Sequence, residues 1–326
     1  MKRQILVLLV LIFGLSLKGQ DLPLYSQYTL NPYLMNPSIA GIAGCGILQA
    51  VNRTQWTGIQ DAPYTYAVSY HQRLGQVGLG GYVSDDKNGL TQNLGFQFTF
   101  AYHVIKNTED KSKQLSFGIS FCGAQHSIDQ TKFLAIENDP IASGTLQSFF
   151  AFNANAGMYY IHRNFFAGLS VANLFSTDNS ITKSKIEPTN LRNYFFQFGY
   201  SFYLKTSVVL EPSALVKTTE SFNKQVDTNL KLVFLTSAGY RIWFAASYRR
   251  NMDNSLGTSN SFMPIICFSG TRFSFAYAFD YSLTSIGRFA SGSHEIMIGY
   301  TFCNLNRSET TCPAYKSYNK WQIRKN

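Results

Sequence analysis

Near the end of the chain, three side chains have the chemistry of catalytic groups: Asp280, His294 and Glu295. A carboxylate and a histidine can act together as general acid and base, but no Gly-x-Ser-x-Gly turn accompanies them and no nucleophile stands beside a base. His294 and Glu295 begin a predicted strand, so their side chains should point to opposite faces. We therefore predict that the chain is not an enzyme, and that this segment orders a loop or contacts a partner.

The segment Asp85-Asp86-Lys87-Asn88-Gly89 has the composition of a cation-binding loop. It lacks the spaced acidic ligands of a calcium site, so we expect a polar turn there. The chain has neither a phosphate loop nor a dinucleotide fingerprint. The other histidines lack the spacing of metal ligands: His71, His103, His126 and His162. We expect no cofactor and no metal.

The chain has five cysteines, an odd number for a protein of an oxidising compartment. Cys303 and Cys312 are close enough in sequence to close a small loop after the last predicted strand, which makes a disulfide between them possible. The other cysteines match no metal site and are interpreted as small buried residues: Cys45, Cys122 and Cys267.

The alternation of apolar and polar side chains predicts the β-strands that carry these residues. From Phe96 to Val104 one face is almost wholly aromatic and the other is small and polar, as in strands between lipid and a polar interior. Pro264 interrupts one of the weaker segments. The pattern recurs about fourteen times and predicts an all-β, antiparallel transmembrane barrel, with strands at Ile47–Arg53, Tyr64–Gln72, Val77–Val83, Gly95–Val104, Leu115–Cys122, Phe150–Tyr160, Phe165–Val171, Tyr194–Leu204, Ser207–Val216, Thr228–Leu235, Tyr240–Tyr248, Phe262–Phe268, Arg272–Asp280 and His294–Phe302.

The composition agrees with a barrel in a membrane. Aromatic residues make up 15% of the chain and charged residues only 14%, whereas about a quarter of the residues of a soluble domain are charged. The mean hydropathy is nevertheless −0.08, because the polar face of each strand dilutes the apolar face. These values favour a transmembrane barrel over a soluble enzyme.

The start of the chain has the pattern of a secretory signal. Lys2 and Arg3 precede the apolar run Ile5–Leu17, which is too short to span a bilayer comfortably, and cleavage near Gly19 is expected. No later apolar stretch approaches about 18 residues, which excludes inner-membrane helices. We predict a signal peptide over residues 1–19 and an exported protein.

The formal net charge of +10 does not indicate nucleic-acid binding, because an exported chain does not meet nucleic acid. Part of the charge leaves with the signal. Much of the rest lies in a basic tail, predicted over residues 303–326, that suits anionic lipid or an acidic partner. Its basic residues are Arg307, Lys316, Lys320, Arg324 and Lys325.

Long and short connections alternate between the predicted strands. Gly75 makes a tight turn, Asp85–Asn93 is longer, and Gln125–Phe149 and Ala172–Asn193 are longer still, with Lys106–Lys113 the main exception. Outer-membrane barrels have short periplasmic turns and longer external loops. An even strand number places both termini in the periplasm. We therefore expect the outer membrane of a Gram-negative bacterium.

Four irregular segments depart from the barrel pattern. The first contains Ser26-Gln27-Tyr28 and two Asn-Pro pairs that end at Gly41, and it fits either a plug in the lumen or a periplasmic lead-in. The others are Arg53-Thr54-Gln55-Trp56-Thr57-Gly58 with Ala62-Pro63, then Asp86 to Gly89, then Asp280-Tyr281-Ser282 leading to Ser291-Gly292-Ser293-His294-Glu295-Ile296. In this order the segments resemble the PorP/SprF family of outer-membrane proteins associated with the type IX secretion system.

The resemblance implies a non-enzymatic barrel that supports secretion or surface attachment of a secreted type IX partner such as an adhesin, with possible contacts to periplasmic machinery. An ordinary porin or uptake channel is the alternative, and a lipid-active barrel enzyme is a third class. We expect the partner at the external loops Thr57–Pro63, Gln125–Phe149 and Tyr281–Ser293. The candidate contact residues are Trp56, Gly58, Pro63, Asp86, Gly89, Asp280, Ser282, Gly292, His294 and Glu295. The predicted organisation is signal peptide 1–19, Asn-Pro segment 20–45, barrel 46–302 and tail 303–326.

Overall fold

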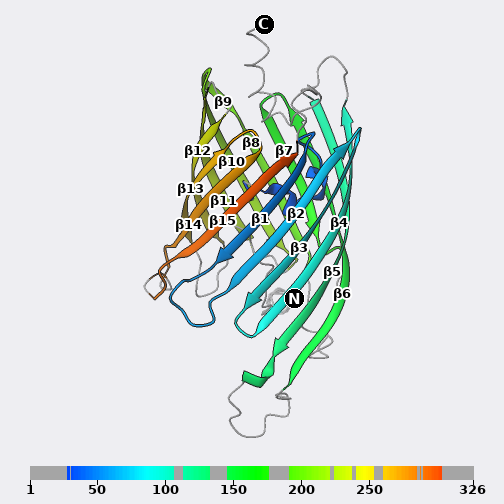
Figure 1. The fold of residues 1–326 in the computed structure, drawn as a ribbon, viewed down its shortest axis with the longest axis vertical. Helices are drawn as coiled ribbons and strands as arrows, with labels where there is room; N and C mark the ends of the chain where they lie inside the picture. Colours follow the sequence, from blue (N-terminus) through cyan, green and yellow to red (C-terminus); the bar gives the residue numbers. More distant parts are fainter. Residues whose placement is uncertain are drawn as a thin grey trace, which may run out of the picture.

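The computed structural model describes residues 28–29, 31–105, 113–132, 145–175, 191–220, 224–236, 240–252, 260–284, 287 and 289–302. The predicted signal peptide and the predicted basic tail lie outside these residues. Nearly all the described residues belong to strands or to the turns between them, and Figure 1 shows the strands tilted around a common axis.

The strands form a single antiparallel sheet that closes on itself. β15 pairs with β1 from Gly46 opposite Phe302 to Thr54 opposite His294, so that the sheet has no free ends. Closure satisfies the backbone groups inside lipid and removes the edges of the sheet. The strands are β1 (Gly46–Thr54), β2 (Tyr64–Leu74), β3 (Val77–Asn88), β4 (Thr91–Ile105), β5 (Lys113–Asp129), β6 (Leu146–His162), β7 (Phe165–Ala172), β8 (Asn193–Tyr200), β9 (Phe202–Lys205), β10 (Val208–Thr219), β11 (Lys224–Leu235), β12 (Arg241–Asn251), β13 (Ser261–Ser269), β14 (Phe273–Ser282) and β15 (Ser293–Phe302).

The barrel has fourteen strands, as predicted, because β8 and β9 are two parts of one strand that lies along β10. Its break at Ser201 lies opposite Glu211 of β10, one residue from Pro212, and proline has no N–H to donate to the neighbouring strand. Pro264 likewise removes a backbone donor from β13. The β13–β14 pairing skips from Phe262 to Ile265, yet the strand continues.

The outer surface of the barrel carries the aromatic stripe predicted from the sequence. Along β4, Phe98 is 65% exposed whereas its neighbour Gln97 is only 2% exposed. Phe100 and Tyr102 continue the outward row. These rings are the lipid contact of the barrel, and the alternating polar residues line its interior.

Two hairpins are longer than predicted. β3 continues to Asn88 and β4 begins at Thr91, so the expected loop over residues 85–93 is a two-residue turn with Gly89 at φ 60°. β5 and β6 each have 17 residues, more than the roughly 9–11 that cross a bilayer. The expected loop over residues 125–149 is therefore partly strand, and Figure 1 shows this hairpin reaching past the other strands.

The two ends of the barrel differ. β1 begins and β15 ends at the same end, where turns such as Gly75-Gln76 and Arg163-Asn164 are two residues long. We call this the short-turn end. The opposite, long-loop end carries the connections over residues 55–63, 173–192 and 283–292.

The N-terminal segment lies inside the ring of strands (Figure 1). We call residues 28–45 the plug segment. Its Asn-Pro pairs open two short 3-10 helices, η1 (Pro32–Leu34) and η2 (Pro37–Ile39), because proline suits the first turn of a helix and cannot sit in its interior. Among the described residues, no helix is long and apolar enough to cross a membrane.

Buried apolar side chains line the part of the lumen that lies across from the plug segment. They form one inward-facing row in which each residue pairs across the sheet with the next, from β10 to β1. Burial of this row away from water stabilises a closed interior. The row consists of Val209, Val233, Trp243, Cys267, Ala276, Met297 and Val51.

Candidate partner-binding site

Arg53 joins the first strand to the last two at the long-loop end. Its Nη2 lies 3.0 Å from Oδ2 of Asp280 in β14, and its Nη1 lies 3.4 Å from Oε2 of Glu295 in β15. All these side chains are buried and point into the lumen. Charges in such a place must be paired, because removing water from an isolated ion is very costly. The motif residues around Arg53 and Asp280 therefore form one structural unit.

The loops above this ion-pair cluster are held together by their backbones. Thr57 N–H donates to Gly292 O at 2.9 Å, and Ser291 N–H donates to Thr57 O at 2.8 Å. Trp56 N–H donates to Ser293 Oγ at 3.2 Å. We call residues 55–63 and 291–293 the seam rim, since they lie above the seam where β15 pairs with β1.

The backbone of the seam rim is strained. Trp56 has φ 47° and Asp61 has φ 54°, values that residues other than glycine rarely adopt. Gly58 and Gly292 also have positive φ, which glycine accepts without penalty. A non-glycine residue in this region costs about 1–3 kcal/mol and persists where the surroundings impose it, often at functional positions. The strained backbone at Trp56 therefore supports a functional role for this loop.

His294 and Glu295 point to opposite faces, as the strand geometry predicted. The Glu295 carboxylate lies in the lumen with Arg53, whereas His294 faces outward. His294 Nδ1 is 2.7 Å from Tyr277 Oη, and its ring packs 5.2 Å from that of Phe279. The barrel wall therefore separates the imidazole from the carboxylate, and the two cannot act on one substrate.

Asp86 and Gly89 do not form a cation loop. Asp86 lies within β3 and accepts a 2.6 Å hydrogen bond from Thr65 Oγ1. Gly89 makes the hairpin turn beyond it. In the part of the chain that the structure describes, no three histidine, cysteine, aspartate or glutamate residues are arranged to hold a metal ion.

The structure brings most of the predicted contact residues to one region and leaves others apart. Pro63 is buried at the end of the loop after β1, where its carbonyl accepts from Gln55 N–H at 2.8 Å. Ser282 Oγ lies 2.8 Å from Thr284 Oγ1 near the end of β14. Asp86 joins the region through Thr65 of β2, but Gly89 lies at the tip of the next hairpin.

The residues that hold the plug segment were not recognised as a site from sequence. Asn36 Nδ2 donates to the carbonyls of Met158 and Leu169 at 3.2 and 3.3 Å, while its Oδ1 accepts from Ser38. Tyr33 Oη donates to Thr99 Oγ1 at 2.8 Å. Burial raises the pKa of Tyr33 to about 12.

Two histidines of the lumen also form hydrogen bonds with the plug segment. Gly41 N–H donates to His71 Nδ1 at 3.1 Å, and His103 Nε2 lies 2.9 Å from the carbonyl oxygen of Ala40, which can only accept. Both histidines lie on the small-residue faces of β2 and β4, and these faces give no sign of their partner. The paired Asn-Pro motif was the signal that could have identified that partner.

The cysteines differ in state. Cys45, at the start of the barrel, is disulfide-bonded, which corrects its interpretation as a small buried residue. Cys122 and Cys267 are free thiols, and of these only Cys267 is fully buried. The predicted pairing of Cys303 with Cys312 lies outside the described residues.

Comparison with known proteins gives a family match. The profile described as "Type IX secretion system membrane protein PorP/SprF" matches residues 17–300. No curated protein matches the chain. Among solved structures, the CymD monoaromatic hydrocarbon channel aligns with a TM-score of 0.49 and 11% identity over 87% of this chain and 94% of that chain. Omp33 of Acinetobacter baumannii aligns with a TM-score of 0.42 and 10% identity over 80% and 99%.

Proposed function

This chain belongs to the PorP/SprF family of type IX secretion system membrane proteins, and from this premise we propose that it is a closed, non-enzymatic anchor that holds a secreted type IX partner, such as an adhesin, at the cell surface. The outer-membrane barrel is the fixed part of this assembly. The seam rim at its long-loop end is the proposed contact for the partner.

The filled lumen is the observation that carries this proposal. The plug segment occupies the side of the lumen lined by β2 to β7, through hydrogen bonds from Asn31 to Ser69, Tyr33 to Thr99 and Asn36 to the β6 and β7 backbones. On the other side, the side chains of the apolar row are buried and packed against one another. A conducting porin needs a polar, water-filled channel. A closed barrel favours binding over passage of solutes.

The seam rim has the properties of a preformed contact surface. The Arg53 cluster fixes it from below, and backbone hydrogen bonds fix it from the side. Loops that are held by a rigid scaffold commonly carry binding residues. We propose that this end faces the exterior and that both termini and the short-turn end face the periplasm, where they contact secretion machinery.

Affinity capture tests the proposal. A tagged barrel is extracted gently in detergent, and the proteins that remain bound are identified by mass spectrometry. We expect one or a few secreted proteins, and we expect the same proteins to leave the cell surface when the gene is deleted. An unchanged surface proteome after deletion would contradict the anchor.

Planar bilayers discriminate the anchor from a porin. The purified barrel should show little steady conductance, because its lumen is filled. A large, steady conductance together with no captured protein would support an uptake channel instead.

A further inference from the structure

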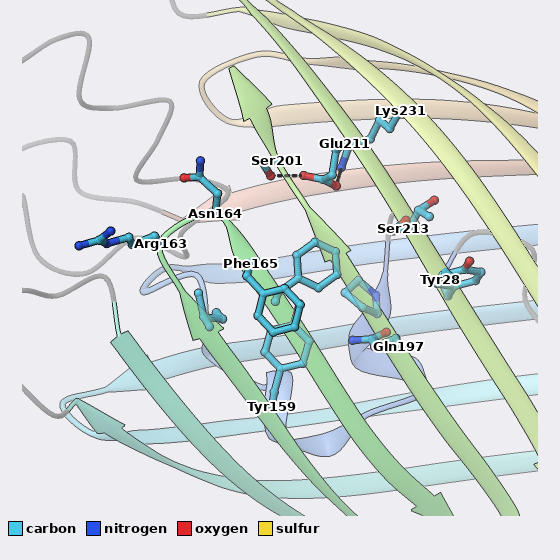
Figure 2. Close-up of a pocket in the computed structure, with 15 residues that line it drawn as sticks. Tyr28, Tyr159, Arg163, Asn164, Phe165, Gln197, Ser201, Glu211, Ser213 and Lys231 are labelled. Atoms are coloured by element: carbon cyan, nitrogen blue, oxygen red, sulfur yellow. Dashed lines mark hydrogen bonds and ion pairs between the residues drawn. The ribbon is translucent and has the colours of Figure 1, made fainter. Parts of the chain in front are cut away.

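A cavity of about 160 Å³ lies between the plug segment and the barrel wall, toward the short-turn end (Figure 2). Tyr28, Thr29 and Pro32 of the plug segment form one side of it. β6, β7, β8, β10 and β11 form the other side, and the turn at Arg163 and Asn164 borders it. This cavity lies apart from the seam rim, which is the proposed contact for the secreted partner.

One part of the cavity is aromatic. The rings of Tyr159 and Phe166 stack with their centroids 6.1 Å apart and their planes at 20°. Pro32 and Ile161 add apolar surface. An engineered apolar cavity of about 150 Å³ binds benzene, so a space of this size suits one six-membered ring.

Another part of the cavity is polar and electrically balanced. Glu211 is ion-paired with Lys231, and it also accepts a 3.0 Å hydrogen bond from Ser201 Oγ. Figure 2 shows these residues together, away from Tyr159 and Gln197. The Lys231 ammonium also lies 5.4 Å from the centre of the Trp243 ring. Because the carboxylate neutralises the ammonium, this part favours a neutral polar group over an anion.

The pair offers both kinds of hydrogen bond. A carboxylate has about four acceptor positions and an ammonium has three donors, so contacts to each other and to Ser201 leave capacity for a ligand. A phenol hydroxyl donates and accepts, and at neutral pH it is uncharged. An aromatic ring with such a hydroxyl matches both parts of the cavity.

We propose that this cavity binds a phenol ring, either as a free phenol or as the tyrosine side chain of a peptide, that enters from the short-turn end. The ring lies against Tyr159, Phe166 and Pro32, and the hydroxyl reaches Glu211 and Lys231. Because the plug segment forms one side of the cavity, the bound ring joins the plug segment to the wall.

Calorimetry with the purified full-length barrel tests the chemistry, with p-cresol and toluene as matched probes. We expect saturable binding of p-cresol, about tenfold tighter than that of toluene, since a site built to hydrogen-bond a hydroxyl rejects the analogue without it. No saturable p-cresol binding, or equal affinity for the two probes, would overturn the proposal.

Two variants locate the binding. Glu211→Leu combined with Lys231→Met replaces both charges together, so no ion is left unpaired. It should abolish the preference for p-cresol and leave toluene binding intact. Ser213→Leu should fill the cavity and weaken both probes at least tenfold. The exposed pair Arg192→Met with Glu220→Leu is the control and should change neither affinity. A preference that survives the Glu211 and Lys231 changes places the phenol elsewhere and overturns the site.

A pair of peptides distinguishes a side chain from a free phenol. Capped Gly-Tyr-Gly should compete with p-cresol, and capped Gly-Phe-Gly should compete at least tenfold less well. Competition by neither peptide would overturn the peptide ligand in favour of a free phenol. Circular dichroism during heating checks that every variant still forms the barrel.

Discussion

Nη2 of Arg53 lies 3.0 Å from Oδ2 of Asp280, and this contact links the first strand to the strand before the last across 227 positions of sequence. Together with Glu295, it places a compact group of charges inside the wall at the point where the barrel closes. The contact explains why residues far apart in the motif order belong to one site.

Replacing Arg53 by methionine should destabilise the barrel. The change leaves the buried carboxylates of Asp280 and Glu295 without a counter-ion, and breaking a buried pair in this way costs about 3–5 kcal/mol. Urea unfolding in detergent, followed by tryptophan fluorescence, measures the loss. Arg192→Met is the matched control, because Arg192 and Glu220 form an exposed pair that contributes at most about 1 kcal/mol. Equal losses in the two variants would refute the buried-cluster explanation.

Trp56 and Asp61 share a left-handed backbone, so their glycine variants separate strain from recognition. Both Trp56→Gly and Asp61→Gly should leave the free energy of unfolding unchanged or raise it by about 1 kcal/mol, because glycine accepts positive φ. Only Trp56→Gly should reduce capture of the secreted partner, since it alone removes an indole. Pull-down from detergent extracts measures how much of the partner each variant captures. Full capture by Trp56→Gly would exclude the indole from the interface.

Gly118 is a position where β5 packs tightly against the plug segment. A Cβ atom there would lie 2.3 Å from the backbone nitrogen of Ser38, so Gly118→Ala should push the plug segment away and cost about 1–3 kcal/mol. Conductance in planar bilayers should rise as the lumen opens. Gly270→Ala is the control, because its Cβ would meet nothing nearer than 3.5 Å. A Gly118→Ala barrel as stable and as closed as the Gly270→Ala barrel would mean that the plug segment is not packed here.

Asn36→Ala tests the packing of the plug segment against the wall by removing hydrogen bonds. The amide of Asn36 donates to two carbonyls of the wall and accepts from Ser38, so its loss leaves buried groups unpaired and costs about 1–3 kcal/mol. Limited proteolysis should then cleave the plug segment faster. Asn88 is exposed at the end of β3, beside the β3–β4 turn. Asn88→Ala is therefore the control and should be cleaved at the same rate as the unchanged protein. Identical cleavage rates in both variants would contradict the role of Asn36.

The cysteines can be assigned by peptide mapping without reduction. We expect a free thiol at Cys122 and at Cys267, and we expect the Cys45 peptide to be released only after reduction. The same digest identifies the peptide that is joined to Cys45, and so tests the pairing of Cys303 with Cys312 that their spacing predicts. A free thiol at Cys45 would contradict the structure.

The outward face of the barrel was predictable because lipid imposes a simple rule on every second residue. Phe98 and Gln97 follow that rule, and the fourteen strands of the barrel lie where alternation predicted them. The rule fails beyond the bilayer, where water lies on both sides. There the ends of β5 and β6 mix polar and apolar residues on both faces, and alternation no longer separates strand from loop.

The contacts inside the lumen were not predictable, because they depend on register. Arg53 meets Glu295 only through the pairing of β15 with β1. Asn36 meets Met158 across 122 positions, which no local pattern encodes. Sequence motifs identified many of the residues of the seam rim, but only the closed sheet shows that an ion-pair cluster joins them.

The plug segment also constrains the order in which the molecule assembles. It is covalently continuous with the first strand, lies within the ring, and makes buried contacts with β4, β6 and β7. Threading it into a finished ring would require stripping water from these polar groups in a confined passage. We therefore expect the N-terminal segment to rest on the growing sheet before the ring closes, and β15 to join β1 only after the interior has been filled. The last strand thus completes a ring around a segment that is already in place.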